Sequence, residues 1–250
     1  GNGGMGDYTD GVVRDQGRLY TVDPEIGGND VINTKLDEYP ASDDIVFGGQ
    51  ARDEIHVGDG NNVVIGDLGF IDYVIDDGEH TSRPTNFDID RIETTQPELG
   101  GIDWITSGIG TDIIIGGEDG RISLVELALN AGPAEATTRR DDDATTNSVG
   151  RIGDVIDAGR GSNLVFGDNG QIISAVSDLS RFGDLPITLG LVKTSDATRG
   201  GDDTITTGLD KDIIFGGVGN DDIVANSGEL YVRTGSTATW DNDNIVLGDH

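Results

Sequence analysis

Aspartates that recur in front of short apolar runs are the residues of this chain with the clearest chemistry. Each run begins with Asp or Asn, continues with three apolar residues and ends in a glycine turn. The six runs are DIVFGG (44–49), NVVIGD (62–67), DIIIGG (112–117), NLVFGD (163–168), DIIFGG (212–217) and NIVLGD (244–249). A second run of the form Asp, any residue, aliphatic lies nine residues away at Asp53/Ile55, Asp103/Ile105, Asp154/Ile156, Asp203/Ile205 and Asp221/Ile223. Two runs of nine residues predict one coil of a solenoid.

Stacked coils would place the Asp at the start of each strand directly above the Asp of the coil below. Such a stack of carboxylates requires a cation between the layers, because like charges at short range repel strongly. Calcium accepts six to eight oxygen ligands at flexible geometry, and glycine lets a turn adopt positive φ angles that aim carbonyl oxygens inward. The residue types and their spacing therefore predict a row of calcium sites.

The overall charge supports bound cations and excludes other partners. The chain has 47 acidic and 16 basic residues, a formal net charge of −31. This excess predicts no binding to nucleic acid or to anionic membranes. The regularly spaced aliphatic triplets argue against disorder. There are no cysteines, so no disulfides stabilise the fold, and no apolar stretch approaches the length of a membrane span.

A longer repeat of about 100 residues contains these runs. It is visible in the matched glycine turns at Gly101 and Gly201, and again at Gly66 and Gly167. We expect four segments: 1–26 (the end of a preceding repeat), 27–99, 100–199 and 200–250 (the start of the next repeat). Because both ends lie inside the repeat pattern, the chain is expected to be part of a longer array. Polar excursions are expected at about 72–99, 126–149, 177–199 and 233–241, each opened by a longer strand of the GxLxxV type and continued as a loop.

The runs fall into two classes that alternate every nine residues and predict an all-β, parallel β-solenoid with two sheets. One class has a single aliphatic residue between polar ones, which is typical of a strand with one face in water, and the other is apolar throughout. The first sheet would contain Ile32, Ile55, Ile105, Ile156, Ile205 and Ile223, and the second Val46, Val64, Ile114, Val165, Ile214 and Val246. The outer face of the second sheet would carry Phe47, Ile65, Ile115, Phe166, Phe215 and Leu247. The excursion strands or a neighbouring molecule must cover that face.

The segment GGVGNDDIV (216–224) resembles the nonapeptide of the RTX (repeats-in-toxin) calcium-binding β-roll family, and SGIGTDIII (107–115) resembles all but its first glycine. The resemblance implies one calcium ion per glycine turn, held by the carboxylate before the strand and by turn carbonyls. Carried onto this chain, it implies metal ligation by Asp30, Asp44, Asp53, Asp103, Asp112, Asp154, Asp203, Asp212 and Asp221, with Asp67, Asp168 and Asp249 in the glycine pairs as further candidates. Asx turns and ladder hydrogen bonds are the alternative role for these residues.

Departures from the nonapeptide predict weaker turns. Asn62, Asn163 and Asn244 replace the strand-start Asp and offer a neutral oxygen. QAR at 50–52 and RI at 151–152 stand where glycine is expected.

The sequence favours a non-enzymatic, calcium-binding structural segment of a secreted or cell-surface protein, of the adhesin, matrix or filament type. It would fold as calcium binds outside the cell and contact further repeats end to end. The three histidines lack the HExxH spacing of zinc hydrolases, and no nucleophile or phosphate-binding motif occurs. Two alternatives stay open: an RTX export module attached to an enzyme or toxin domain, and a β-helix enzyme that modifies polysaccharides.

Overall fold

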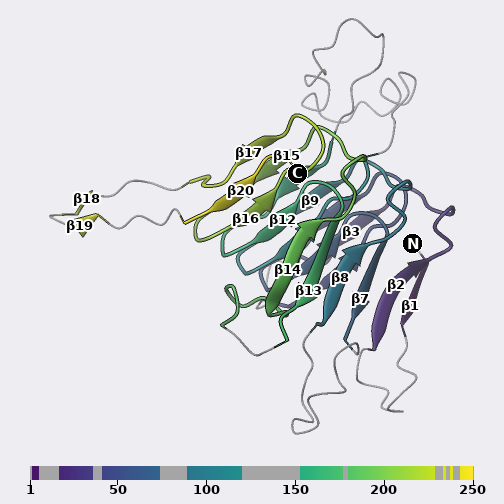
Figure 1. Ribbon diagram of the computed structural model, residues 1–250, viewed down its shortest axis with the longest axis horizontal. Helices are drawn as coiled ribbons and strands as arrows, with labels where there is room; N and C mark the ends of the chain where they lie inside the picture. The colour runs from purple at the N-terminus through teal and green to yellow at the C-terminus, as the bar shows by residue number, and fades with distance from the viewer. Residues whose placement is uncertain are drawn as a thin grey trace, which may run out of the picture.

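The computed structural model describes residues 2–5, 17–35, 41–73, 89–119, 153–176, 180–228, 233–234, 237–238 and 243–249. Within these ranges the fold is all-β, with three six-stranded sheets and one short hairpin, β18 (Arg233–Thr234) with β19 (Thr237–Ala238). Figure 1 shows the sheets as stacks of short arrows that run from purple strands at one end to yellow strands at the other.

Two of the sheets are parallel and share one strand order. The half-polar sheet contains β3 (Val31–Asn33), β5 (Glu54–His56), β9 (Trp104–Thr106), β11 (Val155–Asp157), β15 (Thr204–Thr206) and β17 (Asp222–Val224). The apolar sheet contains β4 (Ile45–Phe47), β6 (Val63–Ile65), β10 (Ile113–Ile115), β12 (Leu164–Phe166), β16 (Ile213–Phe215) and β20 (Ile245–Leu247). Successive strands of these two sheets alternate along the chain, so one strand of each forms a level, from β3/β4 at level 1 to β17/β20 at level 6.

The two parallel sheets pack against each other through the middle residue of each three-residue strand. Side chains alternate between the faces of a strand, so the middle residue faces opposite to its two neighbours. Ile55, Ile105 and Ile156 pair in register along the half-polar sheet, and Val64, Ile114 and Val165 do so along the apolar sheet. These residues form one buried cluster between the sheets. The predicted division into two sheets is therefore confirmed.

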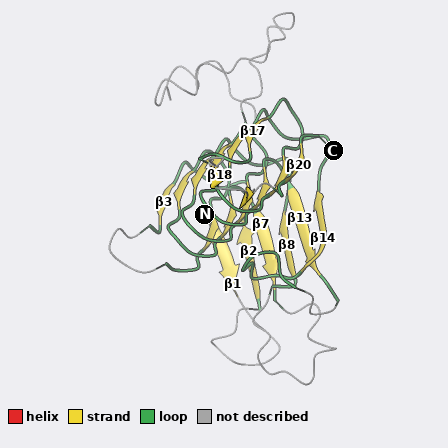
Figure 2. Ribbon diagram, turned by 90° about the vertical axis from the view of Figure 1, so that its left-hand side faces the viewer, coloured by secondary structure: helices red, strands yellow, loops and turns green. Residues whose placement is uncertain are grey.

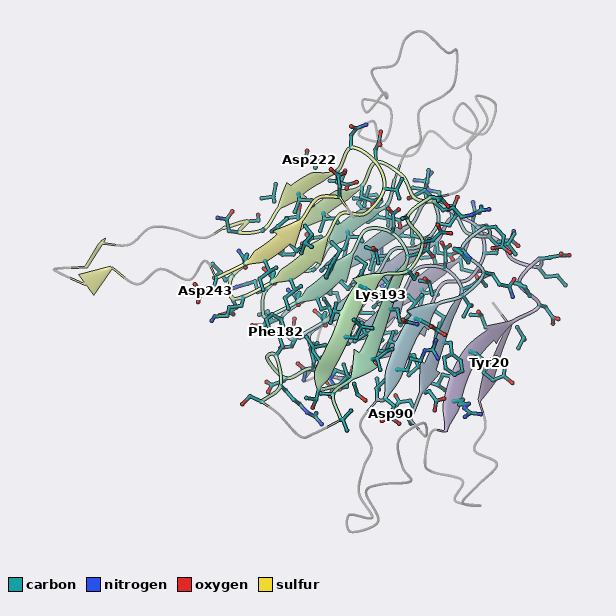
Figure 3. The ribbon with its side chains drawn as sticks, in the orientation of Figure 1. Tyr20, Asp90, Phe182, Lys193, Asp222 and Asp243 are labelled. Atoms are coloured by element: carbon teal, nitrogen blue, oxygen red, sulfur yellow. The ribbon has the colours of Figure 1, made fainter. Side chains whose placement is uncertain are left out.

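An antiparallel cover sheet lies over the outer face of the apolar sheet. It contains, in spatial order, β1 (Asn2–Met5), β2 (Arg18–Val22), β7 (Gly69–Asp72), β8 (Arg91–Thr94), β13 (Gly170–Ser174) and β14 (Leu189–Thr194). Its long arrows stand in front of the parallel stack in Figure 1 and beside it in Figure 2. Figure 3 labels Tyr20 on β2 and Lys193 on β14, which lie toward opposite edges of this sheet.

The cover sheet buries the predicted apolar outer face at the inner levels, whereas Leu247 at level 6 is 39% exposed. Ile65, Ile115 and Phe166 are fully buried and pack with Ile71 and Ile172 of the cover sheet. Phe166 also stacks on Phe215 of the next level, with ring centroids 4.8 Å apart. Coverage therefore comes from the same chain, which was one of the two predicted possibilities.

The excursions differ from the prediction in one respect. The segments expected to be loops at 72–99 and 177–199 contain return strands, β8 and β14, which pair antiparallel with β7 and β13. A strand that leaves the stack exposes an unpaired edge, and pairing with a returning strand satisfies its backbone groups. The excursion at 126–149, the opening strand expected at 120–125 and most of 228–241 lie outside the described residues.

Candidate metal centre

A continuous ladder of aspartates precedes the half-polar sheet. The amide N–H of Asp53 donates to Oδ1 of Asp103 over 2.7 Å, and the amide of Asp103 donates to Oδ1 of Asp154 over the same distance. The pattern begins at Asp30, continues through Asp203 and ends on Oδ1 of Asp221. Each level thus places its carboxylate directly beside the next one, as the repeat spacing predicts.

The second carboxylate oxygens of the interior ladder residues lack hydrogen-bond partners. This holds for Oδ2 of Asp53, Asp103, Asp154 and Asp203, each buried within the protein. A buried carboxylate oxygen without a donor is strongly disfavoured unless a cation satisfies it. Each of these four oxygens is therefore available as a ligand atom for a cation.

Burial makes the ionised form of these aspartates unfavourable. It raises the pKa of Asp53 to about 6 and that of Asp154 to about 7. The pKa values of Asp103 and Asp203 rise well above the ordinary value, first through burial and then through neighbouring aspartates. A bound divalent cation would reverse this effect by favouring the charged form.

Glycines keep the space beside the orphaned oxygens open. A side chain on Gly66 would collide with Oδ2 of Asp103 and the carbonyl oxygen of Gly116. Two levels further along the same row, a side chain on Gly167 would collide with Oδ2 of Asp203. Carboxylate and carbonyl oxygens therefore converge at each gap between levels, and this donor set suits calcium.

The ladder before the apolar sheet alternates strictly between Asp and Asn. From level 1 to level 6 its members are Asp44, Asn62, Asp112, Asn163, Asp212 and Asn244, and the side-chain Oδ1 at levels 2 to 6 accepts from the amide of the level before. Burial raises the pKa of Asp112 to about 6. Because every second member is neutral, no two carboxylates are adjacent in this ladder.

The asparagine side chain also fills part of the role of a cation. Nδ2 of Asn62 donates to the carbonyl oxygens of Gly58 and Gly60, over 3.2 and 3.1 Å, and to Oδ1 of Asp112 over 2.9 Å. Nδ2 of Asn163 donates to the carbonyl oxygen of Gly161 over 3.0 Å. These amides provide hydrogen-bond donors to the turn carbonyl oxygens. The prediction that the asparagine turns bind calcium weakly is consistent with these hydrogen bonds and stays a prediction.

Asp67 and Asp168 occupy the second position of a glycine pair and join two parts of the chain. Asp67 accepts hydrogen bonds from the amides of Gly101 (3.0 Å) and Glu118 (2.6 Å). Asp168 accepts from Gly201 (3.0 Å) and Val218 in the same way. Burial raises the pKa of Asp168 to about 8 and that of Asp67 well above its ordinary value. Each residue thus connects the start of a cover-sheet excursion to its return.

The remaining candidates lie at the outer levels. Asp30, Asp44 and Asp221 are half-buried, and Asp249 is exposed. Asp44 accepts a hydrogen bond from Oγ of Ser42 over 3.3 Å. The structure therefore brings the predicted residues together in two rows, with enclosed positions only at the inner levels.

Sequence reasoning missed Asp119. This residue follows the glycine pair in GGED (116–119), is 1% exposed and has no hydrogen-bond partner at either carboxylate oxygen. Its ligand oxygens lie close to those of Asp168 and Asp203. The available signal was an acid at the position that glycine occupies in GGVG (216–219).

Comparison with known proteins agrees with this donor set. The profile of the RTX calcium-binding nonapeptide repeat matches four copies, over residues 41–70, 153–171 and 198–229. The chain contains RTX calcium-binding repeats. No curated protein and no solved structure matches the chain significantly. The RTX repeats make calcium the metal of this protein, and Asp103 and Asp112, outside the matched ranges, occupy the same ladders.

The described residues include no helix long and apolar enough to cross a membrane.

Proposed function

We propose that this RTX segment is a calcium-stabilised β-solenoid that serves as a structural or adhesive array in a secreted or cell-surface protein. The observation that supports this proposal most strongly is the ladder of buried aspartates with orphaned oxygens at successive levels. A solenoid path is supported by the alternation of strands between two in-register parallel sheets.

Folding and calcium binding would be coupled in this segment. Without a cation, the folded chain must bury several ionised carboxylates near one another, while the unfolded chain keeps them in water. The twelve proposed ligands are the ladder aspartates Asp30, Asp44, Asp53, Asp103, Asp112, Asp154, Asp203, Asp212 and Asp221 with the turn aspartates Asp67, Asp168 and Asp249. When bound, calcium supplies charge neutralisation and oxygen coordination between levels.

The energy available from such sites is sufficient to control folding. For extracellular-type sites with Kd of about 0.1–1 mM, calcium at about 10 mM stabilises the folded state by roughly 1.4–2.7 kcal/mol per site. Several sites together would reach the size of a typical net folding free energy, about 5–15 kcal/mol. The chain would then stay unfolded in a low-calcium cytosol and fold after export.

End-to-end contacts are the second part of the proposal. β20 is an edge strand of the apolar sheet, and Ile245, Val246 and Leu247 are 54%, 45% and 39% exposed. Val31 on β3, at the other end of the parallel stack, is 73% exposed. Unpaired edges with exposed apolar residues favour docking of a further repeat or of a second subunit.

Circular dichroism in EDTA and in millimolar calcium tests the coupling of folding to calcium. We expect strand content to appear only with calcium, and magnesium to substitute poorly because it requires a strict octahedron and loses water reluctantly. Equal strand content in EDTA and in calcium would refute coupled folding. Sedimentation at high protein concentration in calcium tests the end-to-end contacts, which a strictly monomeric segment would contradict.

A further inference from the structure

Three buried aspartates from three different levels meet beside the apolar sheet. Asp119 follows β10 at level 3, Asp168 follows β12 at level 4, and Asp203 precedes β15 at level 5. One carboxylate oxygen from each lies within 4.8 Å of the other two. None of the three residues is more than 1% exposed.

Three of the six carboxylate oxygens in this cluster lack the hydrogen-bond donor that a buried acid requires. Both oxygens of Asp119 and Oδ2 of Asp203 are without a hydrogen-bond partner. The charged groups that act on Asp119 are all aspartates, at positions 154, 203, 168 and 67, and together with burial they raise its pKa well above the ordinary value. A buried carboxylate that has no hydrogen-bond donor and lies close to two other carboxylates indicates a position where a cation can bind.

The size of the cluster matches one calcium ion. Two oxygens that bind the same calcium at about 2.4 Å can lie at most about 4.8 Å apart. The three oxygens meet this limit. Three carboxylates also provide the charge that a buried divalent cation requires, whereas zinc sites draw on His and Cys.

We propose that Asp119, Asp168 and Asp203 together form one calcium site, in which Asp119 joins two residues that the proposed function already names as ligands. Two of its three ligands stand where the nonapeptide has glycine, because GGED (116–119) and GD (167–168) replace GGVG and GG. The site shares the calcium chemistry of the proposed function but depends on Asp119, which the repeat does not supply.

An upstream position in the same fold shows what the extra aspartate adds. Two levels earlier, Asp67 and Asp103 correspond to Asp168 and Asp203, and Ala51 stands in the place of Asp119. The backbone of Ala51 lies against Gly101, whereas the carboxylate of Asp119 lies against Gly201. Among the described residues, the complete set of three carboxylates therefore occurs once, in the second of the two excursion junctions.

The site would fasten the β13–β14 hairpin to the parallel stack. Asp168 lies two residues before β13, and it accepts a hydrogen bond from Gly201, which lies seven residues after β14. A cation held between Asp168, Asp203 and Asp119 would connect levels 3, 4 and 5 at this point.

The number of bound calcium ions tests the proposal. The folded segment is dialysed to equilibrium in saturating calcium, and metal analysis counts the ions per chain for the wild type, Asp119→Asn and Asp119→Gly. Asp119→Gly restores the glycine of the 216–219 turn and provides a second variant with little risk to the backbone. Asp184→Asn is the control, because Asp184 is exposed and has no place in either ladder.

We expect both Asp119 variants to bind one ion fewer than the wild type, and Asp184→Asn to bind the same number. Unchanged ion counts in both variants would overturn the site and would indicate that Asp119 shares a proton with its neighbours instead. A loss of stability as large in EDTA as in calcium would overturn it too, because it would show a purely structural role. A wild type that binds no calcium would instead refute the proposed function.

Discussion

Replacing Asp103 by Asn separates the metal-binding role of the ladder from its hydrogen-bonding role. Asp103 lies at the third of six levels, and its Oδ1 accepts the amide of Asp53 over 2.7 Å. An asparagine retains that acceptor, as Asn62 does in the other ladder. It removes only the charge and the orphaned Oδ2.

The expected size and sign of the effect depend on calcium. In calcium at about 10 mM, Asp103→Asn should lower the free energy of unfolding by about 1.4–2.7 kcal/mol if Asp103 serves one site, and by about twice that if it serves the gaps on both sides. At low calcium the sign should reverse. The folded-state pKa of Asp103 is raised by burial and by Asp154, so its ionised form opposes folding at neutral pH, and the neutral amide removes this penalty.

Urea unfolding followed by circular dichroism over a series of calcium concentrations measures this effect. Asp103→Ala is the matched variant, because it also leaves the amide of Asp53 without an acceptor. Alanine should be less stable than asparagine by about 1–3 kcal/mol at every calcium concentration. If Asp103→Asn lowered stability equally with and without calcium, the assignment of Asp103 as a ligand would be wrong.

Three further predictions follow from the ladders and the core. Asn62→Asp should make folding more dependent on calcium, because it removes two hydrogen bonds to turn carbonyls and adds a carboxylate; a calcium titration of strand content would show a higher midpoint. In chelator, stability should fall as pH rises from about 4 to about 8. The folded-state pKa values of Asp53 and Asp168, about 6 and about 8, lie above the unfolded value, so protonation favours the folded state; strand content in chelator that increased with pH would contradict this. Phe166→Ala should lower the free energy of unfolding by about 3–5 kcal/mol in saturating calcium, because it leaves a cavity beside Phe215; calcium counts should stay unchanged in the folded variant.

The repeat fixes most of the parallel part of this fold through local spacing. Within levels 2 to 5 the two ladder positions are nine residues apart, and the polar or apolar character of the outer residues of a strand determines its sheet. The register observed between Ile55, Ile105 and Ile156 pairs the middle residues of equivalent runs that lie 50 and 51 residues apart in the sequence. The family of the repeat and its calcium chemistry can be predicted from the sequence, because the same residues recur at fixed spacing.

The tertiary structure alone decided how the excursions close and which additional carboxylates meet. β8 and β14 have no repeat to mark them, because each forms by pairing with the strand that precedes it in the cover sheet. Asp119 lies 49 residues before Asp168 and 84 before Asp203 in the sequence, and only the stacking of levels 3 to 5 brings their oxygens together. A period predicts contacts between equivalent positions, whereas a site formed by non-equivalent positions depends on where the chain leaves and rejoins the stack.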